Sequence, residues 1–163
     1  LITGDVGAGK TFLGRMLISR LGPSCVPIQM QNPPQSARQL LRTAVNQLGL
    51  RPESDDRGSL LEEIERHLTR LYNRGRLAVM VLDEAQDLPD ECLRDLRLMS
   101  NWEVESHRLL QIVLVGQPEL RDRLMEATWE SLRQRVVLSY QLGHMPRGDV
   151  PAYIRHRIHI AAA

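Results

Sequence analysis

Cysteines and aromatic residues are scarce in this sequence, and it has no long apolar run. Of 163 residues, two are cysteines (Cys25 and Cys92) and 4% are aromatic. Two cysteines in apolar surroundings cannot build the disulfide framework of a small secreted domain, so we expect two buried thiols in a reducing compartment. The longest apolar run, Leu77–Leu82, is far shorter than the ~20 residues of a membrane-spanning helix. The sequence therefore predicts neither a disulfide-stapled miniprotein nor a membrane span.

Neither sign of charge dominates the sequence. Lys and Arg number 21 and Asp and Glu number 20, which leaves a formal net charge of +1 at pH 7. An overall basic field of the kind that attracts nucleic acid is absent, although a local basic face is compatible with this balance. Hydrophobic residues make up 42% and charged residues 25%, the proportions of an ordinary globular domain. We expect one folded domain with a substantial core.

The two ends of the sequence predict a piece of a longer protein. The chain begins Leu-Ile-Thr-Gly, with neither an initiator methionine nor the charged and then apolar leader of a secreted protein, and it ends in three alanines. We expect the start of the first strand to be missing and the last helix to be cut short.

Short apolar segments alternate with amphipathic ones along the chain. The pattern predicts strands at residues 1–3, 25–30, 77–82, 109–115 and 136–142, and helices at residues 10–21, 36–48, 59–74, 90–99, 118–125 and from 149 onward. Ser59 and Glu62 have the spacing of a capping box, and Pro27 favours an edge position for its strand. This alternation predicts a three-layer α/β fold, with helices on both faces of a central five-stranded parallel sheet. Ligands of such sheets bind beyond the carboxyl ends of the strands.

A glycine-rich segment follows the first predicted strand. Gly4–Thr11 reads G-D-V-G-A-G-K-T and matches the phosphate-loop pattern G-x-x-x-x-G-K-[ST] without a gap. In such a loop the backbone N–H groups bind phosphate oxygens, Lys10 reaches the β- and γ-phosphates, and the Thr11 hydroxyl binds Mg²⁺. A glycine-rich turn before a helix is the structural alternative. The residues expected to bind the nucleotide are Gly4, Asp5, Val6, Gly7, Ala8, Gly9, Lys10, Thr11 and Phe12.

Two acidic residues follow the apolar strand at residues 77–82. Asp83 is expected to hold Mg²⁺, mostly through water, because this ion keeps several of its waters in protein sites. Glu84 is expected to orient or deprotonate the water that attacks the nucleotide. An acidic start to the next helix is the structural alternative. The pair is a weak signal alone and a strong one beside the phosphate loop.

A polar residue ends the second apolar strand. Gln117 follows Gly116 and precedes Pro118, which is placed to start a helix. If this strand lies between the two motif-bearing strands, the Gln117 side chain can contact the γ-phosphate and help to place the water. An ordinary polar residue at a strand end is the alternative.

Two arginines precede the last predicted strand. Arg133 and Arg135 are far in sequence from the phosphate loop, so we do not expect them to reach the phosphates of their own chain. Across a subunit interface, one of them can act as an arginine finger that stabilises charge in the transition state. Arg135 is the first choice and Arg133 the second. Two solvated arginines at a helix end are the alternative.

With these pieces placed, the chain resembles the AAA+ ATPases of the origin-recognition-related group, and most closely the general secretion pathway ATPases. The resemblance runs nearly from end to end and includes the Walker A and Walker B motifs. It is carried by G-D-V-G-A-G-K-T (4–11), V-L-D-E-A-Q-D-L (81–88), L-R-L-M-S-N-W-E (96–103), L-L-Q-I-V-L-V-G-Q-P-E-L (109–120), L-R-Q-R-V (132–136) and Y-I-R-H-R-I (153–158).

The resemblance implies an ATP-hydrolysing, Mg²⁺-dependent homo-oligomer with an arginine finger acting in trans. It divides the chain into an ATPase core (1–145) and the beginning of a helical lid (146–163), whose second arginine sensor is not assigned. In secretion relatives the ATPase domain lies in the cytoplasm, at the inner membrane, and helps to assemble an envelope complex through partners bound by other segments. Transposition ATPases, which bind DNA and select targets, share the same core and are the alternative. A second alternative is a nucleotide-gated assembly module with slow turnover.

Overall fold

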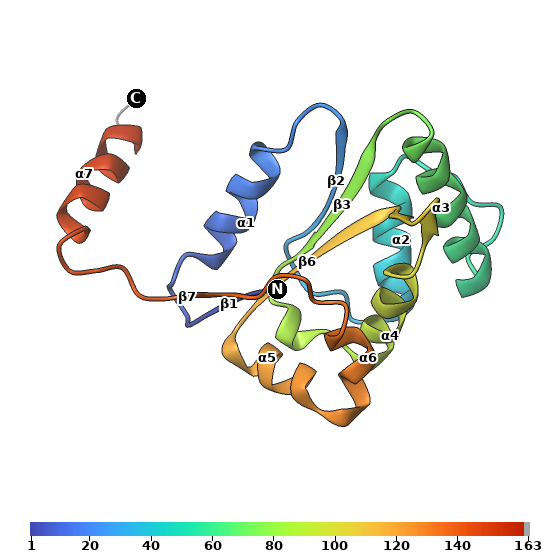
Figure 1. The fold of residues 1–163 in the computed structure, drawn as a ribbon. Helices are drawn as coiled ribbons and strands as arrows, with labels where there is room; N and C mark the ends of the chain where they lie inside the picture. The colour runs from blue at the N-terminus through green and yellow to red at the C-terminus, as the bar shows by residue number, and fades with distance from the viewer. Residues whose placement is uncertain (162–163) are drawn as a thin grey trace.

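The computed structural model describes residues 1–161 as a parallel sheet with helices on both faces (Figure 1). Five strands lie in the order β2-β3-β6-β1-β7, and every neighbouring pair is parallel. Their bounds are Ile2–Gly4 for β1, Cys25–Met30 for β2, Leu77–Leu82 for β3, Leu110–Gly116 for β6 and Tyr140–Leu142 for β7. The predicted five-stranded parallel sheet is confirmed.

The central strand β3 is apolar throughout because both of its faces are covered. Ala78–Leu82 of β3 are all buried, and β3 pairs with β2 on one side and with β6 on the other. β2 lies at the edge of the sheet, where the missing N–H group of Pro27 is tolerated, as the sequence predicts.

The two faces of the sheet are covered unequally. On one face Val79, Val81 and Val115 pack against Leu17 and Ile18 of α1 (Lys10–Ser19). The opposite face carries the larger core, under α2 (Ala37–Gln47), α3 (Arg57–Tyr72), α4 (Asp90–Met99), α5 (Pro118–Met125) and α6 (Glu130–Arg133). Figure 1 shows α1 on one side of the sheet and α2, α3 and α4 on the other.

The first turn of α3 differs from the prediction. The helix begins at Arg57, and its N-cap is Asp56, not Ser59. The Asp56 carboxylate accepts the Ser59 backbone N–H at 3.0 Å and the Ser59 hydroxyl at 2.5 Å. Ser59 is thus a donor to the cap, because the carboxylate of Asp56, three residues before it, accepts its N–H and its hydroxyl hydrogen.

Two strand predictions are also corrected. A short hairpin of β4 (Glu103–Val104) and β5 (His107–Arg108) precedes β6 and was not predicted. The last strand, predicted at 136–142, is confined to β7, where Tyr140–Leu142 pair with Ile2–Gly4 of β1. Val137 and Leu138, which have no strand beside them, are 93% and 75% exposed.

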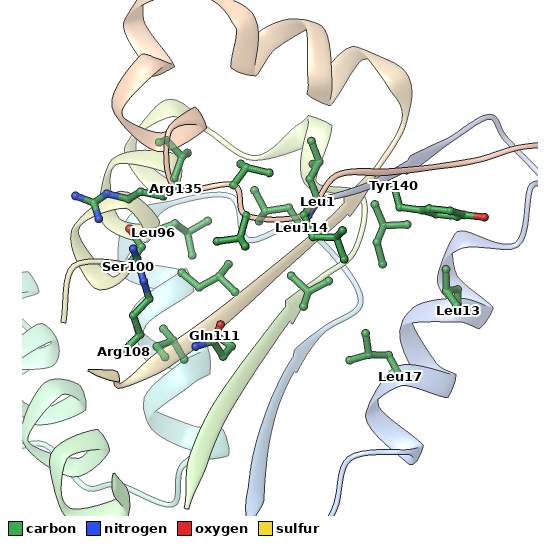
Figure 2. A pocket seen from close by; sticks show the side chains of 18 of the residues that line it. Leu1, Leu13, Leu17, Leu96, Ser100, Arg108, Gln111, Leu114, Arg135 and Tyr140 are labelled. Atoms are coloured by element: carbon green, nitrogen blue, oxygen red, sulfur yellow. Dashed lines mark hydrogen bonds between the residues drawn. The ribbon is translucent and has the colours of Figure 1, made fainter. Parts of the chain in front are cut away.

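An apolar cavity of about 630 Å³ lies beside the amino-terminal part of β6. Leu110–Leu114 of β6 are among the residues that line it. Figure 2 shows Leu13 and Leu17 of α1 at one end of the cavity and Leu96 and Arg135 at the other. The cavity therefore belongs to the end of β6 that is remote from its carboxyl terminus.

The last helix, α7 (Val150–Ala161), stands away from the sheet in Figure 1, and none of its described side chains is buried. None of the helices within residues 1–161 has the length and hydropathy needed to span a lipid bilayer.

Candidate nucleotide-binding site

Three functional segments follow adjacent parallel strands and therefore share one edge of the sheet. β6 lies between β3 and β1. The phosphate loop follows β1, Asp83 and Glu84 follow β3, and Gln117 follows β6. Parallel strands end at the same edge, so Gln117 lies between the loop and the acidic pair. The topology brings these predicted residues together as the sequence analysis expected.

The phosphate loop closes around one backbone carbonyl. The Asp5 carbonyl oxygen accepts the Ala8 N–H at 3.1 Å and Lys10 Nζ at 2.9 Å, and the Lys10 side chain is buried. Gly7 and Gly9 have φ angles of +80° and +93°, a region in which side chains other than glycine are strained. Helix α1 begins at Lys10, so its unpaired N–H groups border the loop. This backbone is suited to binding anionic oxygens.

Three further residues of the predicted nucleotide site are open to solvent. The Val6 and Phe12 side chains are 78% and 56% exposed, and Thr11 is exposed in the first turn of α1. The Asp5 carboxylate lies 3.1 Å from His144 Nε2, which follows β7. Exposed apolar side chains of this kind can line a small-molecule site, so contact of Val6 and Phe12 with a nucleotide stays a prediction.

Asp83 is a buried carboxylate at the end of β3, with 8% of its surface exposed. Its N–H donates to the Met30 carbonyl at 2.9 Å, and its Oδ1 accepts the Glu84 N–H at 3.0 Å. Glu84 has a φ angle of +50°, an uncommon conformation for glutamate that marks stored backbone strain. The strain turns the chain sharply after β3 and starts the 3₁₀ turn η1 (Ala85–Asp87).

Gln86, to which sequence analysis assigned no role, connects the acidic pair to Gln117. Its Nε2 donates to Glu84 Oε2 at 2.8 Å, and its Oε1 accepts the Gln117 N–H at 3.0 Å. Gln117 is the N-cap of α5, and its side chain is half-buried. The only sequence signal for Gln86 was its place in the D-E-A-Q segment, which does not say what it contacts.

Arg123 of α5 is a second residue that sequence analysis missed. Its Nη1 donates to the Gln86 and Leu88 carbonyls at 3.2 and 2.6 Å, and its Nη2 donates to Asp90 Oδ1 at 2.5 Å. The guanidinium carbon also lies 5.9 Å from the centre of the Trp129 ring. Arg123 thereby fixes the turn that follows Glu84, and no motif in the sequence announces it.

The two candidate arginines lie elsewhere. Arg133 Nη1 contacts the Met125 carbonyl at 3.4 Å, at the end of α6. Arg135 borders the apolar cavity, next to Leu96 in Figure 2, and its buried Nε has no hydrogen-bond partner within residues 1–161. Among the described residues, neither arginine forms a hydrogen bond with the phosphate loop, and a role across a subunit interface stays a prediction.

Comparison with known proteins identifies the family. A family model described as an AAA domain matches residues 1–124. The chain belongs to the AAA family. This AAA domain is 36% identical over 162 residues to general secretion pathway protein A of Aeromonas hydrophila. The match covers 99% of the chain but spans only 30% of the length of that relative.

Solved structures agree with the AAA assignment and confirm the three-layer P-loop ATPase fold. The Aeropyrum pernix ORC2 protein in its ADP form has a TM-score of 0.70 and 17% identity over 98% of the chain and 45% of ORC2. The same protein in ADPNP–ADP complexes has a TM-score of 0.67 and 20% identity over 87% of the chain and 40% of ORC2. Cdc6p of Pyrobaculum aerophilum has a TM-score of 0.60 and 16% identity over 86% of the chain and 38% of Cdc6p. These three likenesses support the fold of the domain.

Proposed function

We propose that this AAA domain binds ATP with Mg²⁺ and hydrolyses it where β1, β3 and β6 end. One observation carries the proposal: the strand order places a phosphate loop, a carboxylate pair and a polar strand-end residue on three adjacent strands. Each group has a distinct task in phosphoryl transfer, and the tasks require this proximity.

The phosphate loop supplies the binding energy for the triphosphate. Its N–H groups and the start of α1 bind phosphate oxygens, and Lys10 exchanges the Asp5 carbonyl for the β- and γ-phosphates. Lys10 is held at the loop before ATP arrives, so little side-chain entropy is lost on binding.

Thr11 and Asp83 have the properties of a magnesium site completed by substrate. Thr11 presents an exposed hydroxyl, and within residues 1–161 only the Glu84 N–H donates to the buried Asp83 carboxylate. Those residues contain no group of three or more His, Cys, Asp or Glu that could hold a metal ion. Such a sparse donor set fits Mg²⁺, which takes its other ligands from phosphates and water. When bound, the ion offsets the negative charge that develops on the phosphates.

Glu84 and Gln117 act on the attacking water. Glu84 accepts a proton from the water or orients it by a hydrogen bond, and the half-buried Gln117 contacts the γ-phosphate from the neighbouring strand end. Hydrolysis then depends on Glu84, whereas binding depends on the loop and Lys10.

The test is to compare Glu84→Gln with Lys10→Ala. Glu84→Gln should bind a fluorescent ATP analogue with a Kd within about twofold of the parent, while its turnover falls by about 10²-fold or more. Lys10→Ala should lose binding, because the phosphate contact itself is removed. Turnover that survives in Glu84→Gln, above the level of Lys10→Ala, would contradict the role of Glu84.

We further propose that the active form is a homo-oligomer in which Arg135, or failing it Arg133, completes the site of a neighbouring copy. Arg135 carries a buried, unpartnered Nε, and it lies beside the cavity at the amino-terminal part of β6. An arginine displaced from its own phosphate loop suits a role in trans.

The biological process is proposed from the relative at 36% identity, a general secretion pathway protein. On that basis the ATPase drives assembly of a secretion-type envelope complex, with α7 beginning the lid over the site. Turnover by the full-length protein should rise with its own concentration and should not respond to long double-stranded DNA. Stimulation by DNA that fades with added salt would instead favour a transposition-type role.

A further inference from the structure

The side chain of Gln86 is anchored at all of its polar atoms. Nε2 donates to Glu84 Oε2 at 2.8 Å and to Asp87 Oδ2 at 3.1 Å, and Oε1 accepts the Gln117 N–H at 3.0 Å. A carboxamide has two N–H donors and one oxygen, and only this orientation matches donors to carboxylates and oxygen to N–H. The side chain thereby joins the end of β3 to the end of β6.

The neighbouring strand has room for this carboxamide only because residue 116 is glycine. A Cβ added to Gly116 would lie 2.7 Å from Gln86 Oε1 and 3.3 Å from the Gln86 backbone nitrogen. Real Cβ atoms do not approach an oxygen so closely, so a larger residue would displace Gln86. Gly116, at the carboxyl end of β6, therefore leaves the space that the Gln86 side chain occupies.

The backbone beneath Gln86 is fixed from the other side by Arg123. This arginine donates to the Gln86 carbonyl at 3.2 Å and to the Leu88 carbonyl at 2.6 Å. It is anchored in turn by Asp90 and by the Trp129 ring. With its backbone held and its amide fully bonded, Gln86 has little freedom to rotate.

We propose that Gln86 is a positioning residue for ATP hydrolysis, which aims the Glu84 carboxylate and couples it to the strand end that bears Gln117. The inference rests on the proposed hydrolytic function. By holding Oε2, the amide of Gln86 limits the rotation of Glu84 and leaves Oε1 to face the water. Because the same amide accepts the Gln117 N–H, movement of Gln117 on contact with the γ-phosphate is passed to Glu84.

The test separates hydrolysis from binding. Gln86→Ala should lower turnover by about 10- to 100-fold, a part of the effect of a general base, while the Kd for a fluorescent ATP analogue stays within about twofold. The matched control is Gln47→Ala. Gln47 also bonds through both ends of its amide, to the Gln29 N–H and carbonyl at 2.7 and 2.6 Å, but at the far edge of the sheet. Its loss should leave turnover unchanged.

A double-mutant cycle distinguishes positioning from a general structural role. If Gln86 acts through Glu84, adding Gln86→Ala to Glu84→Gln should not lower the residual turnover further. A further loss of the same factor would overturn the proposal, as would unchanged or increased turnover in Gln86→Ala alone. If Gln86→Ala does not fold, Gln86→Glu preserves the size and removes the donor, and it must show the same loss.

Failure of this inference is distinguishable from failure of the proposed function. A parent protein with no more turnover than Lys10→Ala overturns both. A parent that hydrolyses ATP, a Glu84→Gln variant that does not, and a Gln86→Ala variant that still does overturn the role of Gln86 alone.

Discussion

At the residue scale, the carboxylate of Asp95 is the most deeply buried acidic group among the described residues, with 1% of its surface exposed. Arg57 Nε donates to its two oxygens at 3.0 and 3.3 Å, and Arg57 Nη2 donates to Oδ1. The hydrogen-bonded Asp95 carboxylate raises the pKa of Arg57 above its usual value. A buried carboxylate is tolerated only when such a partner is present, so this pair ties the start of α3 to the inner face of α4.

Removing Arg57 should therefore be costly. Arg57→Ala leaves the Asp95 carboxylate buried without its partner, and we expect a loss of about 2–4 kcal/mol in the free energy of unfolding. Urea denaturation followed by circular dichroism measures this. Arg38→Ala is the control, because the Arg38–Asp55 pair is exposed on both sides and should contribute less than about 1 kcal/mol. Equal losses in the two variants would refute the importance of burial.

At the element scale, the start of α3 depends on a single carboxylate. The hydroxyls of Ser54 and Ser59 donate to Asp56 Oδ2 at 2.6 and 2.5 Å, and the Ser59 N–H donates to Oδ1. These hydrogen bonds hold the pKa of Asp56 far below its usual value of 3.8. The pKa of Asp56 is lower in the folded than in the unfolded state, so the ionised cap stabilises the fold at pH values above the unfolded pKa. This stabilisation is lost as the pH falls toward the folded pKa.

We accordingly expect a pH-dependent effect of Asp56→Ala. The variant should melt at a lower temperature than the parent at neutral pH, and the gap should narrow as the pH falls below about 4. Thermal denaturation at several pH values gives the comparison. Glu62→Ala is the control: Glu62 is exposed, and the capping box predicted for it is not formed. A difference in melting temperature that does not change with pH would contradict the stabilising role of the ionised Asp56 carboxylate.

The sequence predicts these elements well where local chemistry decides the structure. β3 is an unbroken apolar run, β6 is apolar from Ile112 to Val115, and Pro118 starts α5 as expected. The β4–β5 hairpin was missed because Glu105 and Ser106 take φ angles of 50° and 66°, which such turns usually reserve for asparagine and glycine. No composition signal indicates a turn of this kind.

The residues of the candidate site also fall into two groups, those that local motifs predict and those that only the fold reveals. The phosphate loop and the Asp83–Glu84 pair are local motifs and were predictable. The role of Gln86 depends on β6 lying beside β3, and that of Arg123 on α5 packing against η1, contacts that join residues more than thirty positions apart. Local patterns carry no information on such pairs, because only the folded chain brings them together.

At the scale of the whole molecule, the proposed oligomer makes a prediction about mixtures. Arg135→Ala should lower turnover yet leave nucleotide binding intact, because Arg135 borders the cavity beside β6 and not the loop of its own chain. Mixing it with Lys10→Ala should restore part of the turnover, since an intact Arg135 from one variant meets an intact loop from the other.

The matched control mixes Lys10→Ala with Glu84→Gln. Lys10 and Glu84 of one chain serve the same site, so every site in this mixture lacks one of the two and turnover should not recover. Recovery in neither mixture would argue against a shared site.

The unequal cover of the sheet has a consequence for the lifetime of the protein. Among the described residues, five helices pack on one face, whereas α1 alone packs on the other and begins inside the phosphate loop. Local opening of α1 therefore undoes the ligand site and wets that face of the sheet in a single event. A bound nucleotide opposes this opening by mass action, and the opposite face does not respond to it. We therefore expect limited proteolysis without nucleotide to cut this half of the domain first, and added nucleotide to slow that cleavage.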